Sequence, residues 1–210
     1  MSFDSYQKVS EVIQEYKIIS TSENFIEDNS RCIEVSHSFR EELAFSIQEF
    51  VFEESEYAVC ETIVFPILRE VYKSYRDRFT LWSHKSIRYD EKLYGIPDYI
   101  LAKRSPLGKE VFETPFFVTI EAKKDDFVKG WGQGLAEMVA IQKINTTQKI
   151  KRVFGIVSNG QLWQFGQLSN NHFMKNIQAY TVSDLDKLLS AVDYIFSQCV
   201  LELEAIEQSD

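Results

Sequence analysis

The sequence contains little glycine, proline and cysteine. Its 210 residues include 8 Gly and 4 Pro, and this scarcity excludes a disordered or fibrous chain. Cys32, Cys60 and Cys199 are odd in number and far apart, so no disulfide framework is expected. We interpret them as reduced thiols, which predicts a cytoplasmic protein.

Long hydrophobic runs and a secretion signal are also missing. No apolar stretch approaches the ~18 residues that span a bilayer, which predicts no membrane segment. The first residues, MSFDSYQKVSEV, contain neither a basic region nor an apolar one, so a signal peptide is not expected. The histidines (His37, His84 and His172) are isolated, and no zinc site with Cys/His spacing can be drawn.

The rest of the composition is that of a globular protein. Apolar residues make up 44% of the chain and charged residues 26%, which are ordinary values for a soluble domain. The 16 Phe, 10 Tyr and 3 Trp supply ample bulk for a core. At this length we expect a single domain over residues 1–210.

Hydrophobic periodicity divides this domain into three parts. Residues 1–55 are predicted to be an N-terminal helical part, residues 56–168 a core, and residues 183–206 a C-terminal helix with Ser183 as its N-cap. The core begins with a helix that reaches about residue 75. Pro66 lies inside this helix, where a kink or an earlier start is expected.

Short segments rich in β-branched and aromatic residues predict the strands of the core. A helix over residues 128–144 separates the third strand from the fourth. This order predicts an α/β fold with a mixed central sheet flanked by helices. The predicted strands are 79–84, 99–103, 116–123, 153–158 and 162–168.

The chemically informative residues lie between positions 95 and 124. The strands on either side of this segment's loop can pair as a symmetric hairpin. If Asp98 lies opposite Glu121 in that hairpin, the residue numbers of every pair add up to 219. The turn then falls between Lys109 and Glu110, in a polar loop. Asp98 and Glu121 become cross-strand neighbours about 5 Å apart, and Lys123 projects from the same face.

Two carboxylates at that separation repel each other and need a cation between them. A hard divalent ion, Mg²⁺ or Mn²⁺, takes oxygen ligands, polarises a phosphate and lowers the pKa of a bound water. Lys123 is suited to orient or deprotonate the attacking water, or to stabilise charge on the phosphate. The pattern predicts phosphodiester hydrolysis with Asp98, Glu121 and Lys123 as catalytic residues, the two carboxylates also being metal ligands.

The PD pair at 97–98, a spacer of 22 residues and EAK at 121–123 resemble the PD-(D/E)xK signature of the restriction-endonuclease-like nuclease superfamily. The later run RVFGIVSNGQLWQF is similar to a segment in the nuclease domains of type I restriction subunits. The resemblance covers residues 56–168. It implies a restriction-endonuclease-like fold and a metal-dependent nuclease acting on DNA. It leaves open a homodimer or a larger restriction or repair assembly.

The resemblance also implies further site residues. A glutamate on the helix before the sheet often joins the metal site in such nucleases, and Glu61 is the matching position. Gln133, on the helix that follows the ExK motif, is expected near the substrate, with Lys124 and Lys129 along the phosphate backbone. Some relatives would have tyrosine at position 137, where this chain has Glu137.

Other interpretations of these residues remain open. The hairpin carboxylates and lysine also fit a surface acid–base cluster. A carboxylate directly after the apolar run 116–120 argues against this interpretation, because a buried charge is costly unless it is paired. Glu61 also fits a salt-bridged helix residue, and Gln133 a helix start packed tightly on the sheet. The alternatives to a nuclease are a catalytically silent binding or assembly module of the same fold, or a plain protein-interaction domain.

The net charge of −9 is unevenly distributed. Residues 85–152 hold 13 Lys and Arg against 9 Asp and Glu, whereas the segments on either side are acidic. A phosphate group meets the charge within a Debye length of about 8–10 Å. The charge therefore argues against general coating by nucleic acid and is compatible with contact in one cleft.

Overall fold

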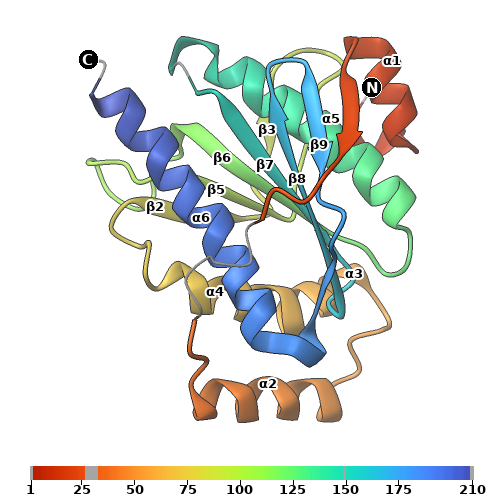
Figure 1. Cartoon of the computed structure of the whole chain (residues 1–210), viewed down its shortest axis with the longest axis vertical. Helices are drawn as coiled ribbons and strands as arrows, with labels where there is room; N and C mark the ends of the chain where they lie inside the picture. The colour runs from red at the N-terminus through yellow and green to blue at the C-terminus, as the bar shows by residue number, and fades with distance from the viewer. Residues whose placement is uncertain (1, 27–32, 149, 209–210) are drawn as a thin grey trace.

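The computed structural model describes residues 2–26, 33–148 and 150–208, so the interpretation of Cys32 lies outside the described residues. Within them, the chain forms a central mixed sheet with helices on both faces (Figure 1). The strand order is β1-β9-β8-β7-β6-β5-β2, and β10 pairs with β8. The predicted α/β class, with a mixed sheet flanked by helices, is confirmed.

Runs of helices and runs of strands follow one another along the chain. The strands are β1 (Ile19–Ser22), β2 (Phe79–Ser83), β3 (Ile87–Arg88), β4 (Tyr94–Gly95), β5 (Tyr99–Lys103), β6 (Glu113–Ala122), β7 (Arg152–Ser158), β8 (Leu162–Ser169), β9 (His172–Lys175) and β10 (Tyr180–Thr181). The α-helices are α1 (Val9–Tyr16), α2 (His37–Glu49), α3 (Glu56–Val59), α4 (Phe65–Tyr72), α5 (Phe127–Ile144) and α6 (Leu185–Glu207). Short helical turns are η1 (Phe3–Ser5), η2 (Cys60–Val64), η3 (Asn145–Gln148) and η4 (Val182–Asp184).

The two faces of the sheet bury different helices. Helices α1 and α5 pack on one face, and α2, α4 and α6 lie over the other (Figure 1). Strand β7 illustrates the division, because successive side chains of a strand point to opposite faces. Val153 and Val157 join the cluster around α5, whereas Phe154 and Ile156 join the opposite cluster. Helix α5 also carries the chain from β6 to β7, which are consequently parallel.

The hairpin formed by β5 and β6 has the predicted register at one end. Tyr99 pairs with Ile120, and the next two pairs keep the sum of 219. The register then shifts on both sides of Ala102, so that Lys103 pairs with Glu113. The prediction of a symmetric hairpin turn is therefore wrong, because bulges displace the strand pairing near the loop. The end that carries the predicted site is regular.

Two predicted helix features differ from the structure. The helix expected from residue 56 to about 75 contains the π-helical turn η2, and Pro66 follows at the second position of α4. Proline lacks the N–H that a regular helix would use, which accounts for a change of helix type there. Ser183 is not an N-cap, since it lies inside η4 and Asp184 precedes α6.

The sheet edge was not expected from the sequence patterns. Strands β1 and β9 have four residues each and pair in parallel. Segments this short show too few alternations for a periodicity signal. Their pairing also joins regions far apart in the sequence, which local patterns do not report.

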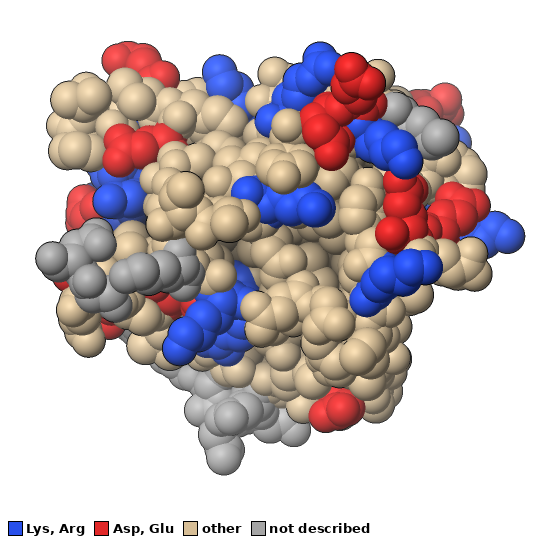
Figure 2. All heavy atoms as spheres, turned by 90° about the horizontal axis from the view of Figure 1, so that it is seen from above, with Lys and Arg blue, Asp and Glu red and all other residues tan. Residues whose placement is uncertain are grey.

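Charges are mixed on the face shown in Figure 2. Basic and acidic side chains of the described residues are interspersed there around a largely uncharged hollow. Such mixing gives no large field of one sign on this face. No helix within the described residues combines the length and apolar character that a membrane crossing requires.

Candidate functional site

A cavity of about 860 Å³ brings the predicted catalytic residues together. Asp98, immediately before β5, lines it with Glu121 at the end of β6 and Lys123 just beyond that strand. Further lining residues come from η1, α3 and the segment after β2, and they include Asp4, Glu56 and His84. Because the β5–β6 register is regular here, the sheet itself fixes the spacing of the two carboxylates.

The Asp98 carboxylate is anchored by the neighbouring strand. Its Oδ2 accepts a hydrogen bond from the backbone N–H of Ala122 at 2.7 Å. The other oxygen, Oδ1, lies 3.4 Å from Nε2 of His84. Burial raises the pKa of Asp98, although the Ala122 N–H, Lys123 and His84 all act to lower it. The side chain is 16% exposed, so one carboxylate oxygen is held and the other is available from the cavity.

Glu121 is buried more deeply than Asp98. Its Oε1 lies 2.7 Å from Nζ of Lys123, and the residue is 6% exposed. Burial and the negative charge of Asp98 raise the pKa of Glu121 to about 7, even though Lys123 acts in the opposite direction. At neutral pH this carboxyl group is therefore poised between its protonated and ionised forms, and a further cation nearby would ionise it.

Glu137 supports Glu121 from helix α5. Its Oε2 accepts a hydrogen bond from the hydroxyl of Thr119, and the residue is 2% exposed. Burial and the negative charge of Glu121 raise the pKa of Glu137 well above its usual range. Glu137 therefore lies close enough to Glu121 for the charge of each to shift the pKa of the other. Position 137 thus holds a buried acid beside Glu121.

Lys123 connects the buried carboxylates to the mouth of the cavity. Its Nζ lies 2.7 Å from Glu121 and 3.3 Å from Oε2 of Glu56. Burial lowers the pKa of Lys123, but the attraction of Glu121, Glu56 and Asp98 outweighs it and raises the pKa. The side chain is therefore an ammonium group. This charge state favours stabilising negative charge over removing a proton from water.

A glycine on α5 makes room for this lysine. A Cβ atom at Gly130 would lie 2.9 Å from Cγ of Lys123 and 2.7 Å from Cγ1 of Val157. At Gly132 it would meet the backbone of Lys8 at 2.7 Å. The alternating glycines at the start of α5 therefore allow close approach on two sides, one of which is the site.

The glutamate contributed by the helix before the sheet is Glu56. Glu61, predicted from the resemblance, is exposed and is not part of the cavity lining formed by the described residues. Glu56 lies in the first turn of α3, lines the cavity and pairs with Lys123. Both glutamates lie on one predicted helix, and its periodicity alone does not decide which of them faces the sheet edge.

The predicted substrate-binding residues lie outside the cavity lining formed by the described residues. Gln133 is 2% exposed and donates a hydrogen bond to Asp4, so the N-terminal segment covers it. Lys124 is exposed and lines a neighbouring cavity, and Lys129 is half-buried in the first turn of α5. Asp4, the partner of Gln133, does line the site.

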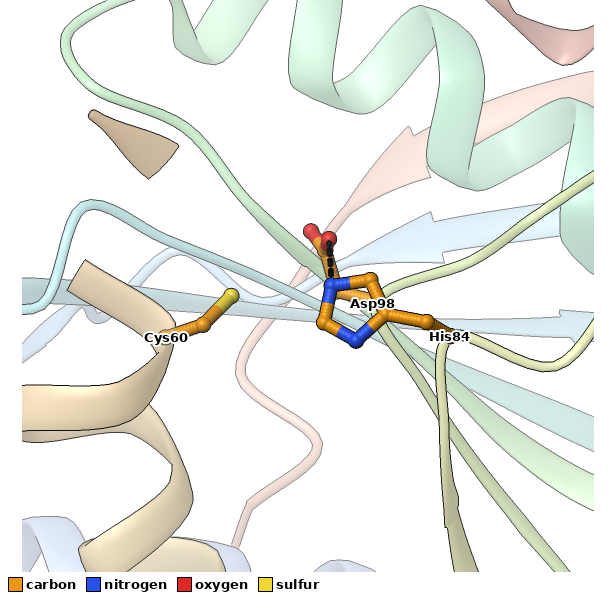
Figure 3. A group of neighbouring side chains, drawn as sticks. All are labelled: Cys60, His84 and Asp98. Carbon is orange, nitrogen blue, oxygen red and sulfur yellow. Dashed lines mark ion pairs between the residues drawn. The ribbon is translucent and has the colours of Figure 1, made fainter. Parts of the chain in front are cut away.

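A second group of ligand-type side chains adjoins Asp98 (Figure 3). One sulfur, nitrogen or oxygen atom from each of Cys60, His84 and Asp98 lies within 4.8 Å of the other two. Sequence spacing did not indicate this Cys/His/Asp group, which could hold a metal ion. These residues come from three separate segments, and sequence spacing reveals only sites whose ligands are close along the chain.

No model of a known protein family matches this sequence, and comparison with functionally curated proteins gives no significant match. The function must therefore follow from the chemistry of the cavity.

Proposed function

We propose that this protein is a divalent-metal-dependent nuclease of restriction-endonuclease-like fold that hydrolyses phosphodiester bonds in DNA. The observation that carries the proposal is the convergence of Asp98, Glu121 and Lys123 in one cavity. These are the residues of the PD-(D/E)xK pattern. A mixed sheet, with a crossover helix after the ExK strand, is the architecture expected around it.

The carboxylates fit a hard cation. Asp98 and Glu121 are both mostly buried, and the charge of Asp98 raises the pKa of Glu121. Mg²⁺ or Mn²⁺ would be held by these two groups, while Glu56 pairs with Lys123. Such an ion supplies Lewis acidity toward a phosphate oxygen and lowers the pKa of a bound water.

The side chains around the two carboxylates have separate roles in the proposed reaction. The ammonium group of Lys123 lies beside Glu121, where it stabilises negative charge that develops on a phosphate. The Ala122 N–H holds one oxygen of Asp98, and Lys123 holds one oxygen of Glu121, whose second oxygen is buried without a hydrogen-bond partner. This leaves the other oxygen of each carboxylate for the cation, which favours a fixed metal position.

Among the described residues that line the cavity, Asp4, Glu56, Asp98 and Glu121 outnumber Arg88 and Lys123, so a DNA substrate requires a bound divalent cation to offset these acids. The segment that carries the site, residues 85–152, is net basic, although the chain as a whole is acidic. A phosphodiester backbone responds to charge within a Debye length, about 8–10 Å. The resemblance to nuclease domains of type I restriction subunits points to the same substrate.

The test is hydrolysis of plasmid DNA, single-stranded DNA and RNA in Mg²⁺ or Mn²⁺, with EDTA as the blank. Asp98→Asn keeps an oxygen that accepts from Ala122 but loses the charge, and Lys123→Met keeps the length of the side chain. Lys124→Met is the matched control, because Lys124 is exposed and outside the cavity. We expect metal-dependent cleavage by the wild type and Lys124→Met, and loss of about 100-fold or more in the other two variants.

Equal activity in all four proteins would contradict the site. A folded wild type that binds DNA without cleaving any substrate would instead support a catalytically silent binding module of the same fold.

A further inference from the structure

His84 is held in an unusual backbone conformation beside the site. Its φ of 48° lies in the left-handed region, which costs a non-glycine residue about 1 kcal/mol or more. The backbone N–H of His84 donates to the carbonyl oxygen of Asp98 at 2.8 Å. This contact fixes the start of β5 to the segment after β2, and it directs the imidazole toward the Asp98 side chain (Figure 3).

The imidazole of His84 is also oriented from its other nitrogen. Nδ1 lies 2.8 Å from Oγ of Ser83, and in the tautomer with its proton on Nδ1 the ring donates to that hydroxyl and Nε2 has a lone pair for an ion. The ring of Tyr57 packs on one side with a centroid distance of 5.4 Å. Metal-binding histidines are oriented in this way, by a hydrogen bond from the nitrogen that does not bind the ion.

Cys60 approaches from the helical side of the cavity. It is the first residue of the π-helical turn η2 and is 1% exposed. Its thiol points toward the space beside His84 and Asp98 (Figure 3). Single π-helical turns are frequent at functional sites because they redirect one side chain of a helix.

The spacing of these atoms suits a tetrahedral ion. Bonds of about 2.0–2.2 Å from zinc to nitrogen and oxygen place those two atoms about 3.3 Å apart. The observed separation between Nε2 of His84 and Oδ1 of Asp98 is 3.4 Å, which is long for a direct hydrogen bond. A Zn–S bond of about 2.3 Å requires the sulfur about 3.6 Å from the nitrogen. All three atoms lie within 4.8 Å of one another, so a shift of the thiol by about 1 Å completes the set.

We propose that Cys60, His84 and Asp98 form a second cation site, selective for a borderline transition-metal ion such as Zn²⁺ or Co²⁺. A thiolate and an imidazole favour such ions over Mg²⁺, which prefers oxygen ligands. His84 and Asp98 line the cavity, so the fourth position of the ion faces the cavity and is open to water or substrate. Three protein ligands with one open position is the pattern of catalytic zinc sites.

This second site shares Asp98 with the proposed Mg²⁺ site but does not depend on nuclease activity. Its binding is measured without turnover, so its failure and the failure of the proposed function are separate results. The Asp98 oxygen that does not accept from the Ala122 N–H serves both proposed sites, so the two ions share or compete for that atom.

The test is titration of the metal-free full-length protein with Co²⁺, followed by absorbance. We expect visible d–d bands of a tetrahedral ion and a thiolate-to-cobalt charge-transfer band in the near ultraviolet, both removed by one equivalent of Zn²⁺. Cys60→Ser should abolish the charge-transfer band. His84→Ala, a change at a partly exposed side chain, should weaken Co²⁺ binding at least tenfold. Ser83→Ala should weaken it about tenfold by releasing the imidazole.

The controls are the two other cysteines and the second carboxylate. Cys32→Ser and Cys199→Ser should keep the full spectrum, and Glu121→Gln should keep the charge-transfer band. A wild type without that band overturns the proposal. So does a band that survives in Cys60→Ser, or one that is unchanged in His84→Ala.

Discussion

Glu121→Gln should make the metal-free protein more stable at alkaline pH. The pKa of Glu121 is about 7 in the folded protein, against an ordinary value of 4.5. Between these pH values the folded protein retains a proton that the unfolded chain has lost, so stability falls as pH rises. Since one pH unit corresponds to about 1.4 kcal/mol, the ionised Glu121 costs about 3 kcal/mol above pH 7.

Glutamine resembles the protonated carboxyl group and carries no such cost. The attraction of Lys123 is already included in the pKa of about 7, so its loss adds no separate penalty. At pH 8 the variant should exceed the wild type by up to about 3 kcal/mol. For a protein of this size that is about 6–12 °C in melting temperature. Near pH 4.5 the two proteins should melt together.

The assay is thermal unfolding in EDTA at pH 5, 6.5 and 8. Glu110→Gln is the control, because Glu110 is an exposed glutamate in the loop between β5 and β6. Its melting temperature should equal that of the wild type at each pH. A Glu121→Gln variant that is less stable at pH 8, or whose advantage does not change with pH, would refute the reasoning about the buried carboxylate.

Two further predictions concern helix α5. Gly130→Ala should lower stability by about 1–3 kcal/mol and reduce hydrolysis, because the added methyl group would displace Lys123. A methyl group at Gly134 would meet only an ordinary contact at 3.6 Å, so Gly134→Ala should be neutral or stabilising by up to about 1 kcal/mol. If denaturant unfolding shows that Gly130→Ala and Gly134→Ala lose the same free energy of unfolding, this account of the packing is wrong. Glu137→Gln should unfold like the wild type, since the amide oxygen can still accept from Thr119, whereas Glu137→Ala should cost about 3 kcal/mol. If chemical unfolding shows the two changes at position 137 to be equally harmful, the hydrogen-bonding role of Glu137 is wrong.

The part of the site that lies on one hairpin could be predicted from the sequence. Asp98 and Glu121 belong to strands that are adjacent in the chain, and a single register condition places them together. That condition holds for the three pairs nearest the site. It fails toward the loop, where bulges around Ala102 shift the pairing, because a polar loop tolerates several turn lengths.

The rest of the site depends on contacts between distant segments. Cys60 and His84 meet Asp98 only after α3 and β2 pack against the hairpin, and no local spacing records that meeting. Gln133 is covered by Asp4 from the other end of the sequence. Periodicity finds the helix that carries a residue, but the neighbouring element decides whether that residue faces a cavity or a covering segment.

The role of Lys123 likewise required the structure. From sequence, a lysine beside two acids suits either a proton acceptor or a stabilising charge. Burial lowers its pKa, but the attraction of Glu121, Glu56 and Asp98 outweighs this effect and raises it, which favours the charged form. The sequence supplied the residue type, and the surrounding carboxylates select between the two chemistries.

The central claim is that Asp98 and Glu121 hold a divalent ion that hydrolyses DNA with the help of Lys123. The most direct measurement is the single-turnover cleavage rate of plasmid DNA at saturating Mg²⁺, for the wild type and for Asp98→Asn. We predict metal-dependent cleavage that falls by about 100-fold or more in the variant, with a melting temperature no lower than that of the wild type. Equal rates in the two proteins, or cleavage by the wild type that persists in EDTA, would contradict the account.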